Sequence, residues 1–294
     1  EEADGSRVVL SLEQGKTYHF AVAALEKDMQ WEIESAKTKN GFVYTNLADN
    51  TVEILKYTGT ESNVTIPDKI DNKVVKTLGA ESFTENETVV GVTIPAQVTN
   101  LQYGAFASCT NLKKVTFAQG SQLKKIKEET FEHCQKLEEI HIPDSVTQIE
   151  KGAFYYCRSL SKLTLGKKLE VIDNNAFEGC SSLKQIEIPD SVESIGEGAF
   201  TYCTSLEHVT IGNKLAYVAK SAFSWCNLTE ITWGDGIAKI GDSAFACNQK
   251  LPTVSIPDTV TELEYKAFAG CVELSDIEIP DSVEAIGGYA FEKW

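Results

Sequence analysis

The sequence predicts a solenoid of the α/β class, and three observations support this prediction. Phenylalanine recurs in one slot from Phe83 to Phe291, at intervals of 22 to 25 residues. Alternating runs such as Leu183-x-x-Ile186-x-Ile188 place their apolar side chains on one side, as β-strands do. Segments such as Ala199-Phe200-x-x-Cys203-x-x-Leu206 have the three-residue spacing of a helical turn. A period of this length indicates stacked repeats that bury one another's apolar faces.

Each predicted repeat is one coil of about 23 residues, and the copy from Leu183 to Cys203 is the clearest. Pro189-Asp190-Ser191 ends the strand, because proline cannot donate to a ladder and Asp and Ser favour turns. Val192 and Ile195 then point inward again, and Gly196 permits a tight bend. We expect about ten such repeats, with a continuous parallel sheet on one face and short helical turns on the other.

The chain divides into a β-rich N-terminal capping segment, residues 1–60, and a solenoid, residues 61–294. Alternation around Val8 to Leu12, Tyr18 to Val22 and Met29 to Ile33 predicts early strands, with a helix over residues 21–36 as the alternative. Two further short strands are expected at 42–46 and 51–57, and an extra loop at 71–73. Since the chain stops three residues after Phe291, we expect a solenoid truncated at its C-terminus.

Composition excludes several classes of function. The net charge of -16 repels nucleic acid and anionic lipid, and no run of 18 apolar residues could insert into a membrane. Residues 113–168 are locally positive, with 11 basic and 7 acidic side chains. This lysine-rich zone fits either a solvated face or a docking patch for an acidic partner.

The eight cysteines are expected to be buried packing residues. Seven of them lie three residues after a repeat phenylalanine, and Cys247 lies two after, so they occupy one slot per turn. Disulfides between neighbouring repeats are the first alternative, and a metal site is the second. No C-x-x-C spacing occurs, and we predict neither cofactor nor metal.

No constellation of catalytic residues is visible in the sequence, so we predict that the protein is not an enzyme. The four histidines fall in different slots, and no P-loop, G-x-S-x-G or H-E-x-x-H motif occurs. His141 and His208 are expected on outward strand positions three turns apart, too distant to share a metal. Asp144 and Asp190, in Pro-Asp-Ser turns, are expected to make hydrogen bonds there rather than bind calcium.

Outward strand positions are the candidate partner-binding residues, because they stack into columns that vary while the core holds its shape. A second candidate is an aromatic stripe two residues after the phenylalanine slot, interrupted by Gly179. The alternative for both is an ordinary solvated surface. The candidate strand residues are Lys114, Glu139, His141, Lys162, Glu187, His208 and Glu230, and those of the stripe are Tyr156, Tyr202 and Trp225.

The repeat units resemble the bacterial surface leucine-rich repeat proteins of the BspA-like type. The likeness rests on Ile188 to Phe200, on Ile142-Pro143-Asp144-Ser145-Val146 and on Ile279-Pro280-Asp281-Ser282-Val283. The resemblance implies a right-handed leucine-rich repeat solenoid, secretion to the cell surface, and adhesion to host or neighbouring-cell proteins. It offers no catalytic residues to carry over. Asn86 and Cys247 depart from the pattern.

The resulting hypothesis is a monomeric, secreted or cell-surface protein that recognises another protein through its sheet face. One alternative is a structural spacer that presents a missing C-terminal module. The other is a carbohydrate-binding surface protein that uses the aromatic stripe to hold a glycan.

Overall fold

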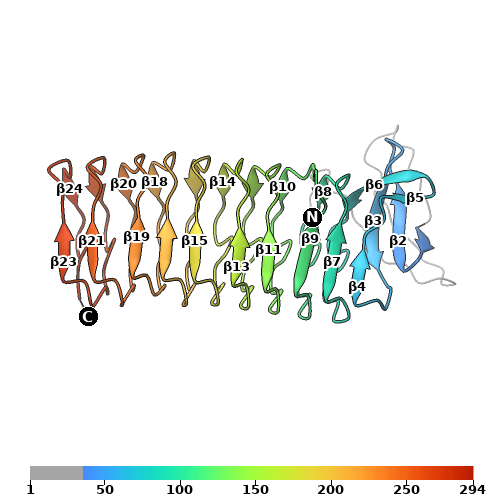
Figure 1. The fold of residues 1–294 in the computed structure, drawn as a ribbon, viewed down its shortest axis with the longest axis horizontal. Helices are drawn as coiled ribbons and strands as arrows, with labels where there is room; N and C mark the ends of the chain where they lie inside the picture. Colours follow the sequence, from blue (N-terminus) through green and yellow to red (C-terminus); the bar gives the residue numbers. More distant parts are fainter. Residues whose placement is uncertain (1–35, 294) are drawn as a thin grey trace, which may run out of the picture. The chain divides into compact units, whose positions relative to one another are not determined.

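The structure, a computed structural model, describes residues 36–293, and within that range the chain is built from strands and turns. Figure 1 shows the repeats following one another, each contributing a strand on either side. The expectations for early strands, and for a helix over 21–36, lie outside the described residues except at residue 36. The expected strands at 42–46 and 51–57 are confirmed as β2 (Phe42–Asn46) and β3 (Val52–Tyr57).

One side of the solenoid carries parallel strands of three or four residues, which we call the front strands. Their middle residue is less exposed than its neighbours, often in an exposed–buried–exposed pattern, as the alternation in sequence dictates. They are β4 (Asn63–Thr65), β7 (Gly91–Ile94), β9 (Lys114–Phe117), β11 (Glu139–His141), β13 (Lys162–Thr164), β15 (Gln185–Glu187), β17 (His208–Thr210), β19 (Glu230–Thr232), β21 (Thr253–Ser255) and β23 (Asp276–Glu278).

The front strands do not form the continuous sheet that we expected. They form three ladders, β4 to β13, β15 to β19 and β21 to β23, although the strands on either side of each interruption remain side by side. Each interruption follows a repeat in which the core residue after the strand is not isoleucine, namely Leu165 after β13 and Trp233 after β19. Phe117 holds the same position in β9, yet β9 still pairs with β11, so the residue at this position does not by itself account for the interruptions.

A second set of parallel strands, the back strands, lies on the opposite side of each repeat. They arise from the Val-x-x-Ile part of the unit and pair in register within three ladders, β6 to β8, β10 to β16 and β18 to β24. They are β6 (Lys73–Leu78), β8 (Asn100–Leu101), β10 (Lys125–Ile126), β12 (Gln148–Ile149), β14 (Val171–Ile172), β16 (Ser194–Ile195), β18 (Tyr217–Val218), β20 (Lys239–Ile240), β22 (Glu262–Leu263) and β24 (Ala285–Ile286).

The prediction of short helical turns is wrong, because residues 36–293 contain no helix. The segment around each phenylalanine, which we call the turn wall, has a left-handed residue two positions before and two positions after the ring. Around Phe154 these are Gly152 and Tyr156, with φ of 60° and 55°. A right-handed helix needs negative φ at every successive residue, so two left-handed residues four positions apart in each turn wall prevent it.

Backbone hydrogen bonds in the turn wall run between repeats. The Phe131 amide donates to the Ala153 carbonyl at 2.8 Å, and the Phe154 amide donates to the Ala176 carbonyl at 2.7 Å. In an α-helix the same amides would bond four residues back within one segment. The fold is therefore a β-solenoid with strands on two sides and a ladder of turns between them.

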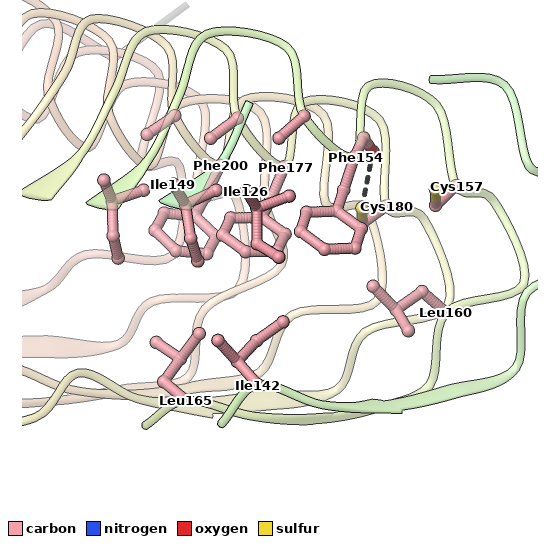
Figure 2. Packing of buried hydrophobic residues seen from close by; sticks show 14 of the residues in the cluster. Ile126, Ile142, Ile149, Phe154, Cys157, Leu160, Leu165, Phe177, Cys180 and Phe200 are labelled. Carbon is pink, nitrogen blue, oxygen red and sulfur yellow. Dashed lines mark hydrogen bonds between the residues drawn. The ribbon is translucent and has the colours of Figure 1, made fainter. Parts of the chain in front are cut away.

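The phenylalanine rings stack along the whole array, and Figure 2 shows Phe154, Phe177 and Phe200 in a row. Ring centroids of neighbouring repeats are 4.8 to 5.8 Å apart from Phe83 to Phe291. Such offset stacks contribute beyond the area that they bury. The core is one column, continuous through all the repeats.

The strands before the first repeat join the same stack. Tyr57 of β3 stacks on Phe83 at 5.1 Å, and Phe42 of β2 packs against Tyr57 at 5.0 Å. The remaining strands here are β1 (Lys37–Lys39), paired with β2, and β5 (Lys69–Ile70), which forms a hairpin with β6. Asp71 and Asn72 make its turn, where an extra loop was predicted, and the Tyr44 hydroxyl donates a hydrogen bond to Asp71.

Candidate functional site

The first column of candidate residues lies along the front strands as expected. Lys114, Glu139 and Lys162 are directly opposite one another on β9, β11 and β13, and all three are exposed. None of them forms an ion pair or side-chain hydrogen bond with another residue of the described range. Alternating charges that stay unpaired on a rigid sheet are available to a partner.

The candidates of the next ladder lie further along the same side. Gln185, His208 and Glu230 are opposite one another on β15, β17 and β19. The His208 Nδ1 is 3.6 Å from a Glu230 carboxylate oxygen, and both side chains are exposed. His141 and Glu187 occupy the second column, opposite Thr164 and Thr210. The interruption between β13 and β15 thus divides the seven strand candidates into two groups.

The aromatic stripe lies on the turn wall rather than on the front strands. Tyr156, Tyr202 and Trp225 all have left-handed backbones, with φ of 55°, 59° and 55°. Tyr202 and Trp225 stack on each other with centroids 6.0 Å apart. Arg158 lies over the Tyr156 ring, with its guanidinium carbon 5.2 Å from the centroid. One face of each of these rings therefore contacts a neighbouring group, although Tyr202 and Trp225 remain exposed overall.

Gly179 is part of the stripe's packing rather than a simple gap in it. Its φ is 73°, and a Cβ at this position would lie 2.9 Å from the Tyr156 ring. The Tyr156 side chain therefore leans over the glycine of the next repeat, which explains why Tyr156 is only half exposed. The stripe and the strand columns are two separate surfaces.

The cysteines belong to the interior, where all eight are buried and unpaired. Each thiol of the regular slot donates to the phenylalanine carbonyl of the preceding repeat, as Cys180 does to Phe154 at 3.4 Å (Figure 2). Burial raises the pKa of Cys226 and of Cys271 to about 12, so these thiols stay protonated at neutral pH. They are structural donors rather than nucleophiles.

Sequence reasoning missed Asn248, which takes over the cysteine slot in the repeat where Cys247 comes one residue early. Its side chain is fully buried, and its Nδ2 donates to the carbonyls of Phe223 and Phe245, each at 2.8 Å. The Leu228 amide donates to the Asn248 Oδ1 at 3.1 Å. Counting three residues from Phe245 would have located it.

The turn aspartates bond to the backbone of the following repeat, in line with their predicted role. Asp144 Oδ1 accepts from the Lys167 amide at 2.8 Å, and Asp190 Oδ1 accepts from the Asn213 amide at 3.0 Å. Among residues 36–293 no group of three or more His, Cys, Asp or Glu side chains is placed to hold a metal ion. The same range contains no helix that could cross a membrane.

These features define a repeat solenoid whose stacked core keeps phenylalanine in one slot of every repeat and whose outward strand residues bear different charges. A family model described as the BspA type leucine rich repeat region matches residues 54–184 and 170–294, in six copies. The chain therefore belongs to the BspA-type leucine-rich repeat family. A search of curated protein sequences finds no match.

Solved structures of bacterial leucine-rich repeat proteins share the fold. The Treponema pallidum leucine rich repeat protein is 26% identical, over 74% of this chain and 91% of that one, with a TM-score of 0.54. A leucine-rich repeat protein from Eubacterium ventriosum is 20% identical, over 87% and 94% of the two chains, with a TM-score of 0.58. The pneumococcal vaccine antigen PcpA is 20% identical, over 88% and 86%, with a TM-score of 0.54.

Proposed function

We propose that this protein is a secreted or cell-surface, non-enzymatic recognition protein that binds another protein through its front strands. The observation that carries the proposal is the register of Lys114, Glu139 and Lys162, three exposed charges in one column without partners in the described chain. Membership of the BspA-type family supports a general role in protein binding or adhesion. We retain residues 1–60 as a capping segment in this proposal.

The front strands suit recognition because their shape and their side chains are set independently. Ile140 and Ile186 point into the core, while Glu139, His141 and Glu187 point away from it on the same strands. Replacing an outward residue leaves the core contacts intact. A partner can therefore be selected by charge pattern at little cost to the stability of the fold.

The experiment compares binding to a panel of immobilised extracellular-matrix and serum proteins. The front variant carries Glu139→Lys, Lys162→Glu and Glu187→Lys. The control carries Glu170→Lys, Lys125→Glu and Glu193→Lys, which change the net charge equally at or beside the back strands. We expect the front variant alone to lose binding by about tenfold or more. Equal binding by both variants would refute the proposal and favour a spacer.

The aromatic stripe offers no comparable support for glycan binding. Sugar rings stack on exposed aromatic faces, whereas Tyr202 and Trp225 face each other at 6.0 Å. If Trp225→Ala loses binding to a glycan array while the front variant keeps it, glycan binding by the stripe would be favoured over protein binding by the front strands.

A further inference from the structure

A shallow hollow opens on the outward side of the front strands β4, β7 and β9. Its volume is about 250 Å³. It extends both columns of outward residues by two repeats beyond Lys114, into positions that the sequence reasoning did not include. The outward residues that line it are Asn63, Thr65, Gly91, Thr93, Lys114 and Thr116, with Lys113 at its rim.

The hollow opens beside Gly91, which contributes no side chain to it. Asn63, Gly91 and Lys114 are opposite one another, so a side chain at position 91 would stand between the other two. Among the outward positions of the ten front strands, this is the one glycine. A glycine inside a strand weakens it and commonly marks a place where a ligand or another chain approaches closely.

The backbone does not require glycine at this position. Gly91 does not have the left-handed φ that favours glycine, and a Cβ there would meet only the Asn63 side chain, whose Oδ1 would lie 2.6 Å away. That atom ends a flexible, exposed side chain, which can move aside. The missing side chain, rather than the conformation of the strand, is the distinctive property of Gly91, and only the movable Asn63 side chain reaches into its place.

The lining of the hollow is rich in hydrogen-bond donors and contains no acid. Thr65, Thr93 and Thr116 are opposite one another and form a row of hydroxyl groups beside the space. None of the three hydroxyls, and not the Lys114 ammonium, has a hydrogen-bond partner among the described residues. The hollow lies at the start of the locally positive stretch 113–168, although the chain as a whole has a net charge of -16.

We infer that the hollow binds a carboxylate side chain from an acidic segment of the protein partner, which deepens the proposed function and rests on it. Lys114 supplies the charge, and the threonine hydroxyls donate to the carboxylate oxygens. Lys113 is less available, because its Nζ is 3.3 Å from the Glu138 carboxylate.

A carboxylate fits the surroundings better than a sulfated polysaccharide does. Glu139 stands next to Lys114 in the same column, and Glu138 lies beside Lys113. A polyanion that continued along the strands would meet these two negative charges after one favourable contact. A single acidic side chain entering the hollow avoids them.

The test uses NMR titration of the ¹⁵N-labelled chain with an acetylated Gly-Glu-Gly-Glu-Gly amide peptide. We expect shifts of the amides of β4, β7 and β9, and no such shifts with the glutamine counterpart. Lys114→Gln should weaken binding about threefold to tenfold. Lys162→Gln removes the same charge from the same column outside the hollow, and should change binding less than about twofold.

A variant that fills the hollow with a side chain tests the inference independently of charge. Gly91→Val suits a strand, and its Cβ meets only the flexible Asn63 amide, so the variant should fold and melt at or above the wild-type temperature. We expect it to lose the peptide shifts.

Four outcomes would overturn the inference: no shifts at β4, β7 and β9, equal shifts with the glutamine peptide, undiminished binding by Gly91→Val, or tighter binding of a heparin-derived disaccharide at this place. If Gly91→Val still captures the panel protein that the front variant loses, this inference fails while the proposed function stands.

Discussion

The turn wall and the front strands share one repeat period, yet they differ in how far the residue type is kept from one repeat to the next. In the turn wall, the same phenylalanine returns in every repeat and stacks on its copies at 4.8 to 5.8 Å. On the front strands, the outward residue changes from Lys114 to Glu139 to Lys162 in three successive repeats. Phenylalanine repeats where each ring contacts its own copy in the next repeat, whereas the first outward column, which meets solvent, changes from one repeat to the next.

Asn248 shows that a hydrogen bond of the interior can recur in a repeat even where the residue that makes it changes. In the regular repeats a thiol donates to the preceding phenylalanine carbonyl, as Cys203 does to Phe177 at 3.3 Å. Asn248 makes the same kind of bond with an amide group, to Phe223 at 2.8 Å. A buried carbonyl needs its donor, and the slot accepts any side chain of suitable size that supplies one.

The largest expected effect comes from removing one ring of the stack. Phe200→Ala should lower the free energy of unfolding by about 3 to 5 kcal/mol, because it leaves a cavity between two neighbouring rings. Phe200 is fully buried, and its centroid lies 5.2 Å from Phe177 and 5.1 Å from Phe223. Urea denaturation measures the change. An unchanged unfolding midpoint would remove the contrast between the wall and the front strands.

The second effect concerns the donor slot. Asn248→Ala should cost about 2 to 3 kcal/mol, because the buried Leu228 amide and the Phe223 carbonyl lose their side-chain partner, while the Phe245 carbonyl keeps only the Cys271 thiol. Asn248→Cys restores one donor and should cost about half as much. If cysteine proves as damaging as alanine by urea denaturation, the slot does not act through its hydrogen bond.

The third effect is a dependence of stability on pH that arises from the buried thiols. The pKa of Cys226 is raised from 9.0 to about 12 in the folded chain, so the unfolded chain ionises first as pH rises. The stabilisation is complete below pH 9.0 and is lost between there and about pH 12.

The variant Cys226→Ala separates the pH dependence due to this thiol from that of other groups that titrate in the same range. Between about pH 8 and pH 10, the wild type should lose about 1 kcal/mol more unfolding free energy than Cys226→Ala does. Urea denaturation in reductant at both pH values measures the difference. Parallel losses in the two proteins would show that this thiol is not held protonated.

The smallest expected effect is on the front strands. Glu139→Gln should change the free energy of unfolding by less than about 0.5 kcal/mol, since the carboxylate is exposed and makes no ion pair with another described residue. Thermal unfolding of Glu139→Gln and Phe200→Ala under the same conditions compares the two losses of stability. A loss of stability near that of the ring deletion would mean that the outward columns hold the fold together.

The sequence led to the right core and the right outward columns, and to the wrong conformation for the turn wall. The spacing Ala199, Phe200, Cys203 and Leu206 fits a helical turn when it is considered within one repeat. The Phe200 amide instead donates to the Ala222 carbonyl of the following repeat, at 2.8 Å. Gly198 and Tyr202, with φ of 63° and 59°, turn the backbone so that this bond forms.

The sequence by itself determined the period, the apolar slots and the alternation that turns Glu139 and His141 outward while Ile140 is buried. These properties follow from which side chains avoid water, and the order of residues records them directly. Only the tertiary structure decided the conformation of the turn wall, the role of Asn248 and the hollow over Gly91. Each of these depends on groups in the neighbouring repeat, about 23 residues away, whose bonds and empty space appear only when the coils are stacked.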